Sequence, residues 1–174
     1  RIEKIVPSHV KFVGSHPMAG SEKSGVKFAQ HDLFKDSVCI VTKTRKTNKR
    51  ALNTVKKFWK TIGTTSKVLS PVKHDRYISF VSHLPHVAAI ALTVAAESSS
   101  LEYASTGFRD TTRIASSDPL LWQDIFMTNR KSIIKSISKY KKILREIEIS
   151  IKGKNKKFLR NILKKSKDIR DRLE

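Results

Sequence analysis

The chain has 174 residues, 39% of them hydrophobic, and its 36 Lys and Arg against 15 Asp and Glu give a net charge of +21. This length and composition support a buried core, in one domain or in one domain with part of another. The single cysteine, Cys39, excludes an internal disulfide and a thiolate metal site. We see no apolar run long enough to span a membrane and no leader, so we expect no membrane partner and a cytoplasmic location.

The positive charge is concentrated toward the C-terminus. Residues 130–174 hold 17 Lys and Arg against 5 Asp and Glu, which is +12 of the total. Such an excess of positive charge suggests nucleic acid as a partner. Proteins that bind single strands also need aromatic side chains for stacking, however, and this segment offers only Tyr140 and Phe158. We interpret the lysines as a solvated helix face and do not expect nucleic acid as a partner. A non-catalytic, basic helical module that binds nucleic acid remains an alternative function.

The first part of the chain has the pattern of an α/β unit. The apolar run Val10–Val13 predicts a buried strand that ends in a loop at His16. Val38–Thr42 predicts a second strand, and Ser66–Leu69 predicts a short third one. Between these two, the spacing of apolar residues predicts a helix over Lys49–Ile62.

From Pro71 onward the pattern is helical. Pro71 lies at a helix start, and the long apolar run Tyr77–Ala96 predicts a helix that is buried on several sides, including at a subunit interface. Pro85 lies within this run, removes a backbone hydrogen bond and predicts a kink.

The rest of the chain continues this helical pattern. Asp118 and Pro119 form a helix start, and an apolar seam runs from Ile137 to Ile151. Gly153 breaks the pattern before a last helix. The predicted fold class is therefore an α/β edge followed by an all-α C-terminal domain, with helix predominating overall.

Three polar clusters stand out from this background. The first joins His16 to Ser21, Glu22 and Lys23, the second is Ser82–His86, and the third is Gly107–Arg113. A histidine can act as a base near neutral pH because its ordinary pKa lies there. The histidines of the second cluster, three residues apart, could hold a metal ion, but no glutamate accompanies them at the zinc-hydrolase spacing, and we assign no metal.

Together these segments resemble the prephenate dehydrogenase family. The matching segments are HPMAGSE at residues 16–22, SHLPH at 82–86 and GFRDTTRIASSDP at 107–119, with Trp122 beyond them. Their order and spacing agree with the family, and the resemblance covers residues 8–135.

The resemblance implies an oxidative decarboxylation of prephenate to 4-hydroxyphenylpyruvate in tyrosine biosynthesis, with hydride transfer to a nicotinamide cofactor. It implies that His16 is the catalytic residue that accepts the proton of the substrate hydroxyl. It implies that Arg113 binds a substrate carboxylate, for which a guanidinium is suited. The alternative substrate is arogenate.

The resemblance assigns four further substrate-binding residues. Arg109 stands where the family also has a basic residue, and Glu22 matches an acidic residue at the mouth of the active site. His83 and His86 match the family's SHLPH segment, and we expect His86 to lie nearer the substrate and His83 to be more structural. The implied cofactor is NAD, with NADP as the alternative, and the implied assembly is a homodimer.

The sequence departs from the family in its cofactor motif. Family members carry a Gly-x-Gly-x-x-Gly turn that holds the cofactor pyrophosphate, and the six glycines here form no such turn. Cofactor-binding residues are therefore not assigned. We expect residues 1–70 to be the C-terminal remnant of a Rossmann-type nucleotide-binding domain, and 71–174 to be a helical domain for substrate binding and dimerisation. We also expect the chain alone to be an incomplete and inactive enzyme.

Overall fold

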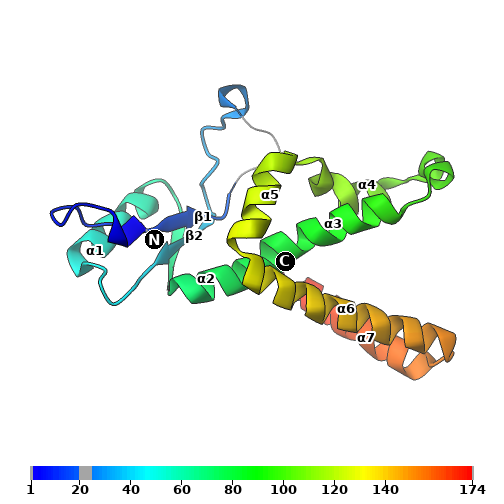
Figure 1. Cartoon of the computed structure of the whole chain (residues 1–174). Helices are drawn as coiled ribbons and strands as arrows, with labels where there is room; N and C mark the ends of the chain where they lie inside the picture. Colours follow the sequence, from blue (N-terminus) through cyan, green and yellow to red (C-terminus); the bar gives the residue numbers. More distant parts are fainter. Residues whose placement is uncertain (1, 20–24, 174) are drawn as a thin grey trace. The chain divides into compact units, whose positions relative to one another are not determined.

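The structure is a computed structural model that describes residues 2–19 and 25–173 (Figure 1). It separates into two compact units, Arg1–Ile133 and Ile134–Glu174. The first unit contains a small sheet and a set of helices, and the second contains a pair of helices. This agrees with the predicted fold class, whereas the predicted division between residues 70 and 71 remains a prediction.

The sheet has three strands in the order β1-β2-β3. The strands are β1 (Ser15–Pro17), β2 (Val38–Thr42) and β3 (Thr65–Leu69). β1 pairs with β2 in antiparallel register, with His16 opposite Ile40, and β2 pairs with β3 in parallel. The predictions for β2 and β3 are confirmed, with β3 one residue longer than expected.

The strand predicted at Val10–Val13 is wrong, and the first strand is instead β1. The residues that find backbone partners on β2 come later, because Gly14 O accepts from Thr42 N at 2.8 Å and Met18 N donates to Val38 O at 2.7 Å. Val10 N donates to Pro7 O, within a local turn. His16 therefore lies inside a strand, where the ladder fixes its backbone, and not in a loop after one.

Helix α1 (Lys49–Thr61) covers the sheet and provides its core. The buried side chain of Leu52 packs with Cys39 and Val41 of β2, and the half-buried Val55 and Trp59 pack against the same cluster. Asn48 caps the helix by accepting from Ala51 N at 3.0 Å. Apolar residues at three- and four-residue spacing thus produce both the helix and its attachment.

The helical part of the first unit follows β3. Its α-helices are α2 (Pro71–Ile78), α3 (Leu84–Ala95), α4 (Thr106–Thr112) and α5 (Pro119–Thr128). Shorter segments join or precede them: π-helical η3 (Ser79–His83), and the 3-10 turns η1 (Ile2–Lys4), η2 (Val26–Phe28), η4 (Ser98–Tyr103) and η5 (Arg113–Ser116). The helix start predicted at Asp118 and Pro119 is confirmed, since Asp118 Oδ1 accepts from Leu121 N at 2.8 Å.

The disturbance predicted at Pro85 takes the form of the π-helical segment η3. Proline has no N–H to donate to the preceding turn, and the helix widens immediately before it. The widening lies between α2 and α3 and carries His83 at its end. π-bulges of this kind are frequent at functional sites.

The apolar run Pro71–Ala95 is long and apolar enough to cross a membrane by length and composition, a test that core helices of soluble proteins also pass. The expectation that no apolar run is long enough to span a membrane is therefore wrong. The run is also less buried in the single chain than predicted. Ile78, Ser79, His83 and Ala89 are buried, while Val72, Val81 and Val94 are each more than two-thirds exposed.

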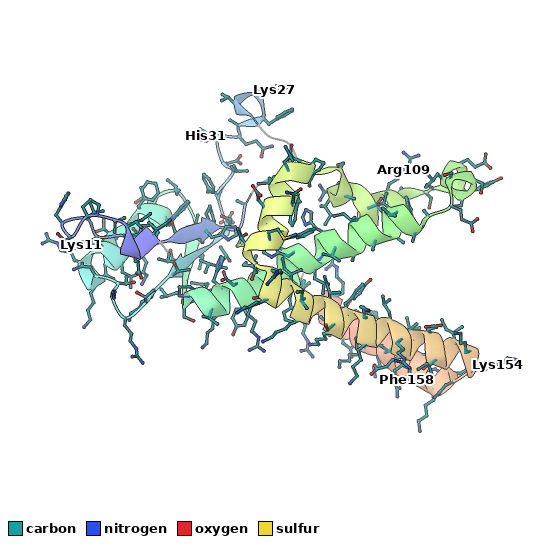
Figure 2. The ribbon with its side chains drawn as sticks, viewed as in Figure 1. Lys11, Lys27, His31, Arg109, Lys154 and Phe158 are labelled. Carbon is teal, nitrogen blue, oxygen red and sulfur yellow. The ribbon has the colours of Figure 1, made fainter. Side chains whose placement is uncertain are left out.

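The second unit is a helical hairpin. It contains most of α6 (Arg130–Lys152), all of α7 (Lys156–Arg170) and the 3-10 turn η6 (Asp171–Leu173). Gly153 and Lys154, the latter with φ of 51°, reverse the chain between the helices, and Lys154 marks this turn in Figure 2. Asn155 then caps α7 by accepting from Phe158 N at 3.0 Å.

Candidate functional site

Two neighbouring histidines connect β1 to α2. Nδ1 of His16 lies 2.9 Å from Nε2 of His74, and Nδ1 of His74 lies 2.9 Å from Oδ1 of Asp75. A carboxylate accepts hydrogen bonds, so His74 carries its proton on Nδ1. Neutral His74 then accepts at Nε2, and His16 donates from Nδ1. The nitrogen of neutral His16 that remains unprotonated is therefore Nε2.

Asn129 connects the same part of α2 to His83. Its side-chain nitrogen Nδ2 donates to the backbone oxygen of Asp75 at 2.7 Å and to Nδ1 of His83 at 3.3 Å. Asn129 is itself held between helices, because its backbone N–H closes α5 and its carbonyl accepts from Ile133 N in α6. His83, whose Nδ1 accepts, carries its proton on Nε2.

These residues line one cavity of about 630 Å³. Its walls come from the N-terminal segment, β1, β2, α2, η3 and α5, and include His16, His74, Asp75, His83, Asn129, Gly14 and Thr42. Three imidazoles, two carboxylates (Asp75 and Glu3) and one amide thus line a single space. Such a cavity can accept a proton at one imidazole and donate a hydrogen bond to an anion from another.

His86 belongs to a second cavity of about 400 Å³, which is mostly apolar and is lined by Ile90, Ile114, Pro119, Trp122, Phe126 and Met127 among others. Its ring stacks on Trp122 with an interplanar angle of 21°. Nδ1 of His86 donates to Ser82 O at 3.1 Å, which leaves Nε2 as the acceptor. Trp122 also contacts His83 edge-on, so its ring touches one histidine of each cavity.

Desolvation, with repulsion from neighbouring imidazoles in two cases, lowers the pKa of His16, His83 and His86 and favours their neutral forms. Desolvation by surrounding residues, and then the charge of His74, lower the pKa of His16. Burial is the largest cause that lowers the pKa of His83, followed by the charges of His16, His86 and His74, while Asp75 acts in the opposite direction. Burial also lowers the pKa of His86, against the effect of its bond to Ser82.

Cys39 lies in β2, opposite Pro17 of β1. It is fully buried, and burial raises the pKa of its thiol, against the effect of a hydrogen bond from the His16 backbone. A thiol in this state is not a nucleophile. Among the residues that the structure describes, no group of three or more His, Cys, Asp or Glu could hold a metal ion.

The structure places the two predicted arginines away from the His16 cavity lining. Arg113 begins η5, which packs on α3, and its neighbours Ile114 and Ala115 line the His86 cavity. Arg109 is exposed on α4, where its Nε donates to Ala104 O at 3.3 Å (Figure 2). Glu22 lies outside the described residues.

His83, rather than His86, shares the cavity with His16, and the roles predicted for the two histidines remain predictions. Sequence reasoning missed His74, Asp75 and Asn129. The signal available for the first two was a histidine–aspartate pair in the first turns of a predicted helix, which we interpreted only as a helix start. Asn129 carried no signal beyond its place between two helices.

Two family models match the chain. The model described as "Prephenate dehydrogenase, nucleotide-binding domain" matches residues 1–68, and "Prephenate dehydrogenase, dimerization domain" matches residues 70–165. The chain is 36% identical over 177 residues to the prephenate dehydrogenase of Bacillus subtilis, covering 98% of this chain and 48% of that protein. It is 31% identical to the cyclohexadienyl dehydrogenase of Zymomonas mobilis, covering 97% of this chain and 60% of that protein. The chain thus spans about half the length of these curated relatives.

Solved structures show the same similarity. The prephenate dehydrogenase of A. aeolicus, in complex with hydroxyphenyl propionate and NAD⁺, superposes with a TM-score of 0.87 at 37% identity, covering 94% of this chain and 59% of that one. The arogenate dehydrogenase of Synechocystis gives a TM-score of 0.83 at 27% identity, covering 94% of this chain and 62% of that one.

The lowered histidine pKa values predict that acid destabilises the first unit. Between those lowered pKa values and the ordinary value of 6.5, the unfolded chain binds more protons than the folded chain. The free energy of unfolding therefore falls as pH drops through 6.5. Urea titrations at about pH 7.5 and about pH 5.5 measure this fall. We expect this fall in the free energy of unfolding to be smaller in His83→Gln. We expect it to be unchanged in the control His31→Gln, a substitution at an exposed histidine (Figure 2). Equal pH dependence in His83→Gln and the unmodified chain would contradict this.

Proposed function

The chain belongs to the prephenate dehydrogenase family, and we propose that it supplies the proton acceptor and part of the substrate site for the oxidative decarboxylation of prephenate to 4-hydroxyphenylpyruvate, with hydride transfer to NAD. The single observation that carries this proposal is the chain of hydrogen bonds from Asp75 through His74 to His16. This series of hydrogen bonds leaves Nε2 of His16 as a basic nitrogen in the cavity, and a basic nitrogen is what removal of a hydroxyl proton requires.

The reaction needs a group that takes a proton and can return it. Hydride leaves the carbon that bears the hydroxyl, the O–H bond breaks, and a C=O bond forms. Loss of CO₂ then sends an electron pair into the ring, and the oxygen becomes that of a phenol, which takes a proton. His16 Nε2 accepts the first proton and donates the second. Between these two proton transfers the His16 ring carries a positive charge, which His74 and Asp75 stabilise.

His83 and Arg113 are the proposed partners for the two carboxylates of prephenate. The Nε2–H of His83 is a hydrogen-bond donor in the cavity that contains His16, and the guanidinium of Arg113 is a receptor suited to a carboxylate. Prephenate is favoured over arogenate because the similarity to prephenate dehydrogenases, at 36% and 37% identity, exceeds the 27% identity to an arogenate dehydrogenase.

The glycines that the structure describes do not form a phosphate cradle for NAD. Gly14, the nearest in sequence to His16, is needed for packing, because an added Cβ would lie 2.7 Å from Thr42 Oγ1. Its carbonyl is also occupied, accepting from Thr42 N and Thr42 Oγ1. Gly14 is therefore not part of a phosphate cradle, and we derive no step through the cofactor.

We also propose a homodimer formed through the helical part of the first unit. The dimerization-domain model covers α2, η3 and α3, whose side chains Val72, Val81 and Val94 are exposed in the single chain. Burial of such side chains against a second copy removes apolar surface from water. This accounts for an apolar run that one chain leaves largely uncovered.

Asp75→Asn tests the proton-acceptor proposal. The new amide can donate to Nδ1 of His74, which moves the His74 proton to Nε2 and forces His16 to carry its own proton on Nε2. The base is then lost, and we expect kcat to fall roughly 100-fold with KM little changed. NADH formation from prephenate, in the enzyme that contains this chain, measures the effect. Asp124→Asn on the exposed face of α5 is the control, and an unchanged kcat in Asp75→Asn would refute the proposal.

The double substitution Val81→Glu/Val94→Glu tests the dimer. Both side chains are exposed in the single chain, so their charge opposes association without disturbing the folded subunit. We expect sedimentation velocity to show a dimer for the unmodified protein and a monomer for the variant. Lys157→Glu/Lys164→Glu, on exposed positions of α7, introduces the same two acids and keeps the dimer. A dimer that persists in the first variant places the interface elsewhere.

A further inference from the structure

A groove of about 920 Å³ runs along α1 to the start of β3, separate from both histidine cavities. Its lining is cationic or neutral and polar throughout: Lys49, Arg50, Asn53, Thr54, Lys56, Lys57, Lys60, Thr64, Thr65 and Ser66. No acidic side chain of the described residues lines it. None of its residues lines the cavity of His16 or that of His86, so an inference about the groove is independent of the proposed reaction.

The positive charge around this groove, unlike that of the second unit, is not accompanied by acidic residues. Residues 37–74 contain ten Lys and Arg and no Asp or Glu. In the described part of the helical hairpin, by contrast, some lysines pair with acids one turn away: Lys142 with Glu146, Lys152 with Glu148 and Lys167 with Asp171. Among the described residues, the groove cations have no such pairs. A general excess of lysine in the protein could explain the charge of the hairpin. It explains less well the charge of the groove, whose lining contains no acidic side chain.

One feature of the groove is unfavourable without a bound anion. Lys49 and Arg50 lie in the first turn of α1, where the helix dipole is positive, and no acid accompanies them there. An anion in the groove would neutralise this charge.

The fold presents these cations on one side of α1. Leu52, Val55 and Trp59 attach the helix to the sheet through a different side, which packs on Cys39 and Val41 of β2. Lys49 and Lys60 are eleven residues apart, which is about 16 Å along an α-helix. The positive charge thus extends along the groove and suits an extended anion better than a compact one.

We propose that this groove binds a linear inorganic polyphosphate. The cations and hydroxyls of the lining suit phosphate oxygens, which accept hydrogen bonds from Lys, Arg, Asn, Ser and Thr. The lining contains no aromatic side chain, whereas single-stranded nucleic acid needs aromatic surfaces for its bases. A chain of phosphates without bases therefore matches the groove more fully than a nucleic acid does.

Titration of the 174-residue chain with fluorescently labelled inorganic polyphosphate, at several salt concentrations, tests the proposal. The groove variant Lys56→Gln/Lys57→Gln/Lys60→Gln removes three cations, and Lys157→Gln/Lys164→Gln/Lys165→Gln removes three exposed cations from α7 as a matched control. We expect the groove variant to weaken binding by about tenfold or more, and to reduce the slope of log K against log salt by about 2, while the control changes neither quantity by half as much. Competition with orthophosphate and with a single-stranded oligonucleotide of equal charge should be weak.

Each other outcome overturns the proposal. Equal losses in the two variants would show general attraction to a basic protein. Oligonucleotide competition as strong as that of polyphosphate, and lost in the groove variant, would make the groove a nucleic-acid site. No binding by the unmodified chain would leave the groove without this ligand. Circular dichroism checks that each variant is folded, and the single substitution Lys57→Gln, expected to act in the same direction, replaces a variant that is not.

Discussion

The hydrogen bond between His16 and His74 is the contact on which the rest of the site depends. It joins a strand to a helix 58 residues later in the chain and lies between two imidazole rings. Only one proton can occupy the space between the two nitrogens. The carboxylate of Asp75 holds the His74 proton on the far nitrogen, and this decides that the shared proton belongs to His16. The position of one carboxylate thus sets which nitrogen of a distant histidine is basic.

Asp75 has a second role through its backbone. Its carbonyl accepts from Asn129, whose same amide nitrogen donates to His83. Residue 75 is therefore the point at which the tautomers of His16 and His83 are both fixed, one as an acceptor and the other as a donor. Burial, and then the charges of neighbouring imidazoles, lower the pKa of both His16 and His83, which favours the neutral rings in which these tautomers exist. A substrate with a hydroxyl and carboxylates meets both kinds of group in one cavity.

Local patterns in the sequence predicted much of the fold. The β-branched run of β2, the apolar spacing of α1 and the Asp118–Pro119 start of α5 each encode an element through neighbours in the chain. The strand at Val10–Val13 was wrong because strand formation depends on partners, and β2 pairs with the residues around His16 instead. His16 and the SHLPH histidines were recognised because they stand in motifs that resemble a family.

The supporting residues of the site could not be predicted in the same way. His74, Asp75 and Asn129 act through contacts between segments 46 to 58 residues apart, and nothing in their local sequence distinguishes them from helix-start and helix-end residues. Arg113, by contrast, was found from its motif, and the structure adds its place on η5 beside the second cavity. Motifs thus identified the groups assigned to the substrate, and only tertiary structure revealed the groups that orient them.

The most direct test of this account is the tautomer of His16 in the folded protein. Nitrogen-15 NMR of the histidine side chains distinguishes a protonated ring nitrogen from an unprotonated one, with His16→Gln providing the assignment. At a pH where His16 is neutral, we predict a protonated Nδ1 and an unprotonated Nε2, and loss of this pattern in Asp75→Asn. A proton on Nε2 in the unmodified protein, or a pattern that Asp75→Asn leaves intact, would contradict the claim that Asp75 prepares His16 as the base.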